Sequence, residues 1–458
     1  MDLQTDLAIV GGGLAGFAAA LEAAEAGGDV VLLEKQSLIG GSTAMSSGCL
    51  AFAGTDLQRA SGIEDSDELL FRELREVGQF ENDEALVRTY VTHQLSTYEW
   101  LRTRGIQFSP ALETSSGQSV PRVHTIDPAD AVRTLAARCR DSGHVRLLTS
   151  SPARRLARHR DSGRVDTVVA EREGQIINVQ ARRAVVLASG GFCHNADLIH
   201  RFAPGCDKAL FIGGEGNVGD GLRMAWLLGA DFRDMPYIKG TYGKHPTDTL
   251  NNHPCLAVYK GAIAVNQDGQ RFVDESISYK LLGDACLVQP YGVSYQILDQ
   301  VIFDTGDNRV RILDFERRLE DGLMISATTL EQLARLIEVS IAALTRTVAE
   351  YNGYVDAGSD PVFGRKHLVH NHGELRRIER APFYAYPSAV AVYGTYCGLC
   401  VDTGMHVLDV YGAPIQGLLA AGEVVGGLHG GAYMTGSSLG KAAIFGRIAA
   451  RTALEQSV

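Results

Sequence analysis

The stretch LAIVGGGLAG, residues 7–16, joins an apolar run to a glycine-rich turn, and an alanine-rich segment follows it. A second apolar run, residues 30–33, ends at Glu34. This order predicts a strand, a tight turn, a helix and a second strand with an acid at its end. It is the pattern of a dinucleotide-binding βαβ unit.

The glycines and the acid of this unit have expected roles. Gly11 permits the tight turn, Gly13 lets the backbone approach a pyrophosphate at the helix N-terminus, and Gly16 allows close packing of helix and strand. Glu34 lies about twenty residues further on, where an acidic side chain binds the ribose hydroxyls. We therefore expect a bound dinucleotide.

Length and charge exclude several classes of protein. The 458 residues allow two or three domains, or one large α/β domain with an insertion. The net charge of -11 argues against a nucleic-acid surface. No apolar run is long enough to span a membrane, and the chain enters its first strand directly after Met1, which favours the cytoplasm. The eight cysteines do not form a disulfide scaffold, and Cys397 and Cys400 are expected to be buried thiols rather than a metal or redox site.

Apolar periodicity predicts the remaining elements. Strands between 145 and 180 indicate an antiparallel meander, and 184–187 forms a buried strand that runs into glycines. Helices are expected at 67–77, 82–104, 130–140 and 329–355, and after residue 216, where Asp220 is the expected N-cap. The predicted architecture is α/β: a Rossmann-like domain with a parallel sheet and the meander, formed by 1–235 and 377–458. An α+β cap, 236–376, interrupts it.

The chain resembles the flavoprotein family of soluble fumarate reductases and 3-ketosteroid dehydrogenases, because the family's markers occur in order over nearly its whole length. They are the glycine turn with Glu34, GGST at 40–43, ASGGF at 188–192, GDGLRMAWLLGA at 219–230, DGQRFVDES at 268–276, Tyr351-Asn352, AAGEV at 420–424 and GSSLG at 436–440.

The resemblance implies FAD, a two-electron reaction at a carbon-carbon bond next to an activating group, and a cap that closes over the flavin. Ser42 to Gly48 lacks the histidine of members with covalent flavin, so FAD is expected to be noncovalent. There is no second GxGxxG for a nicotinamide cofactor, which leaves a quinone, a carrier protein or oxygen as electron acceptor. The expected FAD-binding residues are Gly11, Gly13, Leu14, Ala15, Gly16, Glu34, Lys35, Gly41, Ser42, Thr43, Ser47, Gly48, Ala188, Gly190, Asp220, Gly422, Glu423, Ser438 and Leu439.

Three positions distinguish the branches of the family. Where fumarate reductases have the acid-base arginine, four residues after the glutamate of RFxxE, this chain has Tyr279. Tyr433 replaces their second arginine, and Tyr393-Gly394 replaces their paired histidines. Because these charged side chains are missing, an uncharged, ketone-like substrate fits better than a dicarboxylate. Tyr279 and Tyr433 resemble the tyrosines of the ketosteroid dehydrogenases.

In that branch the resemblance implies α,β-desaturation, with a proton lost from the carbon beside a ketone and a hydride lost from the β-carbon to flavin N5. We assign Tyr279 as the base, Tyr433 as the donor to the carbonyl, helped by backbone NH groups near Gly436, and Thr435 as a proton relay. A tyrosine ionises near about pH 10, so a tyrosine base needs a partner that stabilises the phenolate. The sequence does not show that partner.

Three functions remain open. The first is an FAD-dependent dehydrogenase of a cyclic ketone, either a 3-ketosteroid or a smaller cyclohexanone or oxocyclohexane carboxylate. The second is a fumarate- or urocanate-type ene-reductase, which works in the opposite direction. The third is a noncatalytic flavoprotein subunit. No metal site is predicted.

Overall fold

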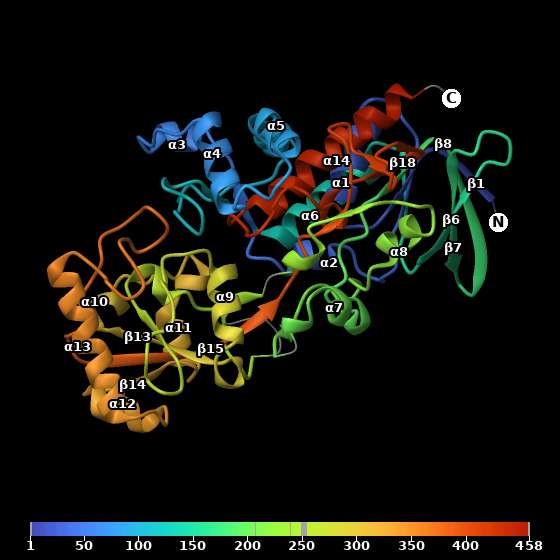
Figure 1. The fold of residues 1–458 in the computed structure, drawn as a ribbon. Helices are drawn as coiled ribbons and strands as arrows, with labels where there is room; N and C mark the ends of the chain where they lie inside the picture. The colour runs from blue at the N-terminus through green and yellow to red at the C-terminus, as the bar shows by residue number, and fades with distance from the viewer. Residues whose placement is uncertain (1, 207, 239, 249–253, 457–458) are drawn as a thin grey trace.

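Two lobes make up the molecule (Figure 1). The computed structural model describes residues 2–206, 208–238, 240–248 and 254–456. The larger lobe contains both ends of the chain, and the smaller lobe is the expected cap.

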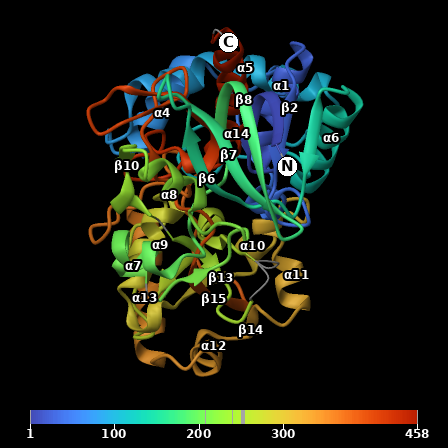
Figure 2. The same ribbon diagram turned by 90° about the vertical axis from the view of Figure 1, so that its right-hand side faces the viewer.

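The larger lobe is built around an eight-stranded sheet whose central path is β17-β18-β8-β1-β2-β5. β1, β2, β5, β8 and β18 run parallel, whereas β17 is antiparallel to β18. β8 is long: its second half lies between β1 and β18, and its first half pairs with the antiparallel hairpin β6-β7. Figure 2 shows this hairpin beside β8 on one side of the lobe. The strand bounds are β1 Asp2–Val10, β2 Val30–Leu33, β5 Val145–Leu148, β6 Ala153–Arg158, β7 Val165–Arg172, β8 Gln175–Leu187, β17 His406–Leu408 and β18 Pro414–Ala420.

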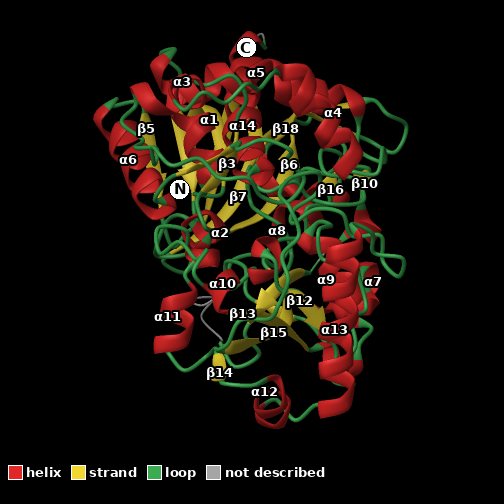
Figure 3. Cartoon of the chain, turned by 90° about the vertical axis from the view of Figure 1, so that its left-hand side faces the viewer, coloured by secondary structure: helices red, strands yellow, loops and turns green. Residues whose placement is uncertain are grey.

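Two apolar helices cover this sheet, as Figure 3 shows. α1 (Leu14–Glu25) and α14 (Ser437–Glu455) pack against each other so closely that a Cβ on Gly446 would lie 2.4 Å from the carbonyl oxygen of Ala15. The other helices of the larger lobe are α2 Gly41–Met45, α3 Asp56–Ala60, α4 Asp67–Val77, α5 Glu84–Thr103, α6 Pro128–Asp141, α7 Ala196–Phe202 and α8 Asp220–Trp226. The predicted helices at 67–77, 82–104 and 130–140 are thereby confirmed.

The cap holds a second sheet of six strands around β15, with the path β11-β15-β13-β12 and with β9 and β14 also paired to β15. Its strands are β9 Leu210–Phe211, β11 Thr241–Lys244, β12 Ile263–Val265, β13 Ser294–Asp299, β14 Ile325–Ala327 and β15 Phe383–Val392. Its helices are α9 Tyr279–Leu287, α10 Gln300–Phe303, α11 Phe315–Glu320, α12 Leu330–Leu336 and α13 Ile341–Ala357.

The mixed α/β fold with an inserted cap is confirmed. The division of the chain at residues 235 and 376 stays a prediction, and the pairing of β9 and β15 takes the cap sheet beyond both positions. β15 runs from the cap toward the larger lobe (Figure 1). Residues 393–396, which directly follow β15, are therefore carried from the cap to the boundary between the lobes.

Three local predictions need correction. β5, the first strand of the expected meander, is parallel to β2 and belongs to the main sheet. The expected helix 329–355 is two helices, because Glu338 has a left-handed φ of 58° and Ser340 caps a new helix. Asp220 is the first residue of α8 rather than its N-cap, which is Gly219.

Two short ribbons complete the structure: β3 (Cys49–Ala51) pairs with β4 (Val123–Thr125), and β10 (Phe232–Arg233) pairs with β16 (Gly398–Leu399). Cys397 and Cys400 beside β16 are free thiols, the first buried and the second partly exposed. Every helix in the described ranges is too short or too polar to cross a bilayer.

Candidate active site

A cavity of about 620 Å³ lies where the larger lobe meets the cap. It opens at the carboxyl ends of β1, β2, β8 and β18, the edge where open parallel sheets bind ligands. Most of the predicted cofactor-binding residues line it: Gly11, Gly13, Leu14, Ala15, Glu34, Lys35, Gly41, Ser42, Thr43, Ser47, Ala188, Gly190, Asp220, Gly422, Glu423, Ser438 and Leu439. The proposed catalytic residues Tyr279, Tyr433 and Thr435 line the same cavity.

The N-terminus of α1 faces this cavity. Its N-cap is Gly13, which provides no side-chain cap, and the backbone NH of Leu14 donates to Thr43 Oγ1 at 3.2 Å. Gly11 has a φ of 114°, and a Cβ there would lie 2.2 Å from the carbonyl oxygen of Ala188. The helix N-terminus therefore has an approach free of side-chain bulk, which suits a dinucleotide pyrophosphate.

Two of the predicted cofactor-binding residues, Gly16 and Gly48, do not line the cavity, and both pack closely against neighbouring backbone. A Cβ on Gly16 would lie 1.9 Å from the carbonyl oxygen of Gly11, so Gly16 brings α1 against the turn. Gly48 has a φ of 74°, and its Cβ would lie 2.0 Å from the carbonyl oxygen of Ile126. Both glycines are therefore required by close packing of the backbone, independently of any contact with a cofactor.

Glu34 is 8% exposed and holds the glycine turn in place. Its carboxylate accepts hydrogen bonds from the backbone NH groups of Gly12, at 2.8 Å, and Gln36, at 2.7 Å. Next to it, Lys35 forms an ion pair of 2.6 Å with Asp220. Binding of the ribose by Glu34 stays a prediction.

A hydrogen-bonded network connects Ser42 to Glu423. The amide of Asn217 donates to Ser42 Oγ at 2.8 Å and to Glu423 Oε2 at 3.0 Å, while the backbone NH of Thr395 donates to Glu423 Oε1 at 2.9 Å. Burial raises the pKa of the Glu423 carboxyl, and the hydrogen bonds oppose that shift. The sequence did not indicate Asn217 as a site residue, although it lies in the glycine-rich turn before the GDGLRMAWLLGA segment.

Three tyrosines gather at the cap side of the cavity. Tyr279, the first residue of α9, and Tyr433 have ring centroids 6.0 Å apart, and Tyr396 lies 4.8 Å from Tyr433. Tyr396 has a φ of 57° and follows β15. The sequence pointed to Tyr279 and Tyr433 but not to Tyr396, whose approach depends on the path of β15 between the lobes.

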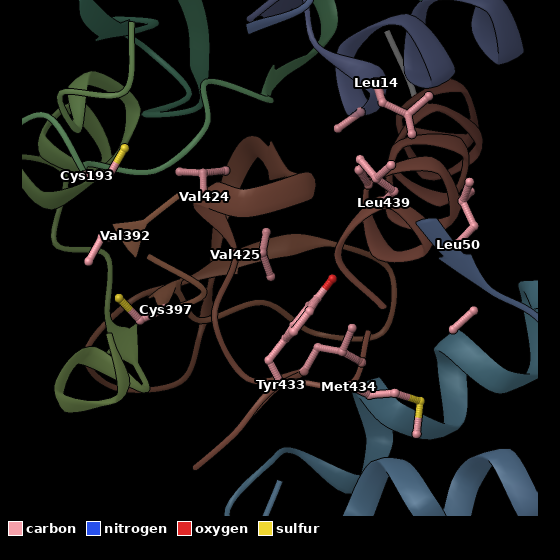
Figure 4. Packing of buried hydrophobic residues seen from close by; sticks show 14 of the residues in the cluster. Leu14, Leu50, Cys193, Val392, Cys397, Val424, Val425, Tyr433, Met434 and Leu439 are labelled. Atoms are coloured by element: carbon pink, nitrogen blue, oxygen red, sulfur yellow. The ribbon is translucent and has the colours of Figure 1, made fainter. Parts of the chain in front are cut away.

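The Tyr433 hydroxyl is held at the N-terminus of α14. It accepts a hydrogen bond of 3.1 Å from the backbone NH of Gly436, the N-cap of that helix. Figure 4 shows the hydroxyl directed toward the side on which Leu439 of α14 and Leu14 of α1 lie. Burial raises its pKa to about 12, so the group is a protonated donor at neutral pH.

Thr435 connects Tyr279 to a second hydroxyl. Its side chain is close enough to that of Tyr279 to lower the pKa of the phenol, and Ser115 Oγ donates to Thr435 Oγ1 at 3.0 Å. Burial and the nearby Tyr433 raise the pKa of Tyr279 well above its usual value, whereas Thr435 opposes the shift. Thr435 is thus in contact with the group whose proton it was predicted to relay.

Lys280 is the most unusual residue of the site. Its side chain is buried, donates to Thr241 Oγ1, and places Nζ 4.3 Å from the ring centroid of Tyr396, 5.4 Å from that of Tyr279 and 5.5 Å from that of Tyr433. Burial lowers its pKa to about 7. A lysine that gains and loses its proton near neutrality beside Tyr279 is a candidate for the phenolate partner that the sequence did not show.

His429 completes the aromatic cluster as a neutral side chain. It lies 5.3 Å from the Tyr433 ring and is next to Ser437, with 3.3 Å between Nδ1 and Oγ. Burial, Lys441 and Lys280 lower its pKa well below the usual value. Among the described residues, no group of His, Cys, Asp and Glu side chains is arranged to hold a metal ion.

The chain matches the model of the FAD binding domain family over residues 6–439, and it therefore belongs to that family. It is 30% identical to a fumarate reductase (cytochrome) of Shewanella frigidimarina, over 99% of this chain and 77% of that protein. It is also 30% identical to a urocanate reductase of Eggerthella lenta, over 98% of this chain and 74% of that one. A 3-ketosteroid-Δ4-(5α)-dehydrogenase of Rhodococcus jostii RHA1 has a similar structure, with a TM-score of 0.80, 27% identity and coverage of 99% and 97%.

The protein is an FAD-dependent oxidoreductase of the fumarate reductase family, acting on carbon-carbon bonds. The glycine turn and the open α1 N-terminus fit the diphosphate of FAD, and the cavity extends from there to the tyrosines. Noncovalent attachment stays a prediction; the described residues that line the cavity include no histidine.

Proposed function

We propose that this protein is a ketone α,β-dehydrogenase that introduces a carbon-carbon double bond next to the carbonyl of a cyclic substrate. The observation that carries the proposal is that the rings of Tyr279 and Tyr433 lie 6.0 Å apart in the cavity lined by the predicted cofactor-binding residues. The similarity to a ketosteroid dehydrogenase over nearly the whole of both chains supports it.

The two tyrosines have different environments, which suit different roles. Tyr433 is held by the NH of Gly436 at a helix N-terminus, where a developing negative charge is stabilised, so it donates to the substrate carbonyl. Tyr279, in contact with Thr435 and beside Lys280, takes the proton from the α-carbon. FAD, when bound, accepts the hydride from the β-carbon. The substrate thus loses one proton and one hydride and gains the double bond.

Lys280 makes the proton transfer feasible. Tyr279 accepts a proton only as a phenolate, and an isolated phenolate in this buried site is costly. Because Lys280 is neutral above its pKa of about 7, it is able to take up a proton as Tyr279 loses one. The pair then keeps the same net charge, and the new cation stabilises the phenolate.

This role predicts a pH dependence. The competent form of the pair has one proton fewer than the fully protonated form, so kcat/KM for dehydrogenation should rise as the pH increases through about 7. In Lys280→Met, this rise should disappear near 7 and move toward the higher pKa of Tyr279. The exposed Lys208, replaced by Met, serves as the matched control and should keep the wild-type profile.

The charged and titratable groups around Lys280 act on its amine in different ways. Glu423, Asp284 and Cys206 favour the protonated amine, while His429 is neutral and the tyrosines ionise at much higher pH. Lys441 is a second buried amine of the site, with its pKa lowered to about 8, and it donates to the carbonyl oxygen of Val425. Lys280 is the amine expected to titrate nearest to 7, and the profile of Lys280→Met separates the two. A wild-type profile unchanged in Lys280→Met would show that the rise belongs to another group.

A second function, ene-reduction of a fumarate or urocanate type, is favoured by the names of the 30% identical relatives. In that direction Tyr279 donates a proton rather than accepting one. Turnover experiments distinguish the dehydrogenase from the reductase. The FAD-loaded enzyme is incubated with saturated cyclic ketones and an artificial electron acceptor, or with unsaturated ones and an artificial electron donor, and the products are identified by mass spectrometry. Formation of an enone supports the dehydrogenase, whereas products only from reduction of enones or unsaturated acids support the reductase.

The proposal includes a cyclic ketone as substrate and an external electron acceptor, which is a quinone, a carrier protein or oxygen. Cytoplasmic location stays a prediction from the sequence.

A further inference from the structure

Arg311 is a positively charged side chain in the cavity that the sequence did not indicate. It begins the short 3-10 turn Arg311–Leu313 of the cap and lines the same cavity as Tyr279 and Tyr433. The turn is fixed beside the cavity wall because the backbone NH of Leu256 donates to the carbonyl oxygen of Ile312 at 3.0 Å. Leu256 and Ile312 also line the cavity.

Among the described residues, the guanidinium of Arg311 has no ion-pair partner and donates no hydrogen bond, although the side chain is half-buried. Burial lowers its pKa from the usual value, while Tyr393 and Asp248 oppose that shift. An arginine has five NH donors in a planar fork, so this one retains its capacity to bind an anion.

Among the described residues that line the cavity near this turn, Arg311 is the cation without an ion pair. Asp248 is within electrostatic reach of Arg311, but it is paired with the buried Lys244 at 2.7 Å. Lys244 and Asp248 cancel each other. Arg318 is a further positive charge, but it is buried, donates to the carbonyl oxygens of Pro254 and Arg311, and is not among the residues that line the cavity, so Arg311 is the cation that a ligand meets there. One carboxylate on a ligand would pair with Arg311. The tyrosines and Thr435 that line the reacting end are uncharged, and Lys280 lies against the rings without lining the cavity, so a second carboxylate would have no lining cation there.

We propose that Arg311 binds a carboxylate of the substrate, so that the enzyme acts on a cyclic ketone carrying one carboxylate. The inference rests on the proposed function for the role of the ketone. The tyrosines hold the reacting end of the molecule, and Arg311 holds the acidic group away from it. This distinguishes the substrate from a neutral steroid ketone and from a dicarboxylate.

The diphosphate of bound FAD would be a second anion in this cavity, so the experiment must distinguish binding of the substrate carboxylate by Arg311 from binding of the diphosphate by Arg311. The probes are 4-hydroxybenzoate and 4-hydroxybenzamide, which have similar shape, differ in charge and are not dehydrogenated at a saturated bond. Their dissociation constants are measured with the oxidised holoenzyme from the change in flavin absorbance, and no turnover is needed. FAD content and FAD affinity are measured on the same preparations.

The wild-type enzyme should bind the acid more tightly than the amide. In Arg311→Gln the acid should bind on the order of tenfold to a hundredfold more weakly, as expected for loss of a charge-assisted hydrogen bond, and the amide should be nearly unaffected. Arg311→Lys should recover part of the acid binding. Arg309→Gln is the matched control, because the exposed Arg309 is two residues away and pairs with Asp307.

Three results would overturn the inference: no preference for the acid in the wild type, equal weakening of acid and amide in Arg311→Gln, or loss of FAD affinity in that variant with the preference retained. The last would assign Arg311 to the diphosphate. If Arg311→Gln does not fold, the wild-type preference and Arg311→Lys still decide the matter. A preference for the acid without turnover of any ketone would instead reject the proposed function alone.

Discussion

Tyr279→Phe is expected to lower the rate of flavin reduction by a saturated ketone by on the order of 10²- to 10⁴-fold, the contribution typical of a positioned general base. Phenylalanine keeps the ring, which packs against Tyr433 and Lys280, and removes only the oxygen that takes the α-proton. FAD binding should not change, since the residues expected to bind FAD are untouched. Stopped-flow absorbance of the flavin measures the rate.

The control for this change is Tyr384→Phe. The Tyr384 hydroxyl donates to Gln300 at 2.6 Å in the cap, and Tyr384 is not among the residues that line the cavity. That variant should reduce its flavin at the wild-type rate. Normal flavin reduction in Tyr279→Phe would show that another group removes the proton.

Tyr433→Phe is expected to slow both flavin reduction and exchange of the substrate α-proton, by on the order of 10²- to 10³-fold. Negative charge develops on the carbonyl oxygen as the proton leaves, and the Tyr433 hydroxyl, held at the N-terminus of α14, is the donor that meets it. Exchange is measured by mass spectrometry after incubation of the oxidised enzyme and a ketone in D₂O.

The exchange measurement distinguishes a role of Tyr433 in polarising the carbonyl from a role in hydride transfer. Exchange needs proton removal and carbonyl polarisation but not transfer of a hydride. If Tyr433→Phe exchanges the α-proton at the wild-type rate while flavin reduction slows, Tyr433 acts only on the hydride step and the assignment as carbonyl donor is incorrect.

Local pattern was sufficient to predict the dinucleotide unit. The glycines at 11, 13 and 16, the strand before them and Glu34 after the next strand are close in sequence, and the structure places them at one edge of the parallel sheet. The break at Glu338 was not predictable in the same way, because the apolar spacing of α12 continues into α13 across a residue with positive φ.

The residues missed at the site are those that depend on long-range packing. Tyr396 reaches Tyr433 because β15 crosses from the cap to the larger lobe, and Arg311 reaches the cavity through a short turn held against Leu256. Lys280 is adjacent to Tyr279 in sequence, yet only its burial against three aromatic rings distinguishes it from an ordinary solvated lysine. These features arise from tertiary structure rather than from motifs.

Replacement of the fumarate reductase arginines by Tyr279 and Tyr433 changes which substrate fits the site as well as which group transfers the proton. Tyr279 and Tyr433 provide uncharged hydroxyls at the reacting end of the cavity, where a ketone oxygen needs a donor rather than a counterion. Arg311 supplies a separate positive charge from the cap. Under the proposed function, the ketone oxygen would therefore be held by Tyr433 of the larger lobe, and the carboxylate by Arg311 of the cap.

The most direct test of the central claim is anaerobic mixing of the oxidised, FAD-loaded enzyme with saturated ketones, including cyclohexanone, 4-oxocyclohexanecarboxylate and a 3-ketosteroid, while the flavin absorbance is followed. We predict that a saturated cyclic ketone bleaches the flavin and yields the α,β-unsaturated ketone, with the carboxylated ketone the most effective. If none bleaches it, and dithionite-reduced enzyme is reoxidised by fumarate, urocanate or an enone instead, the enzyme is a reductase and the proposed direction is wrong.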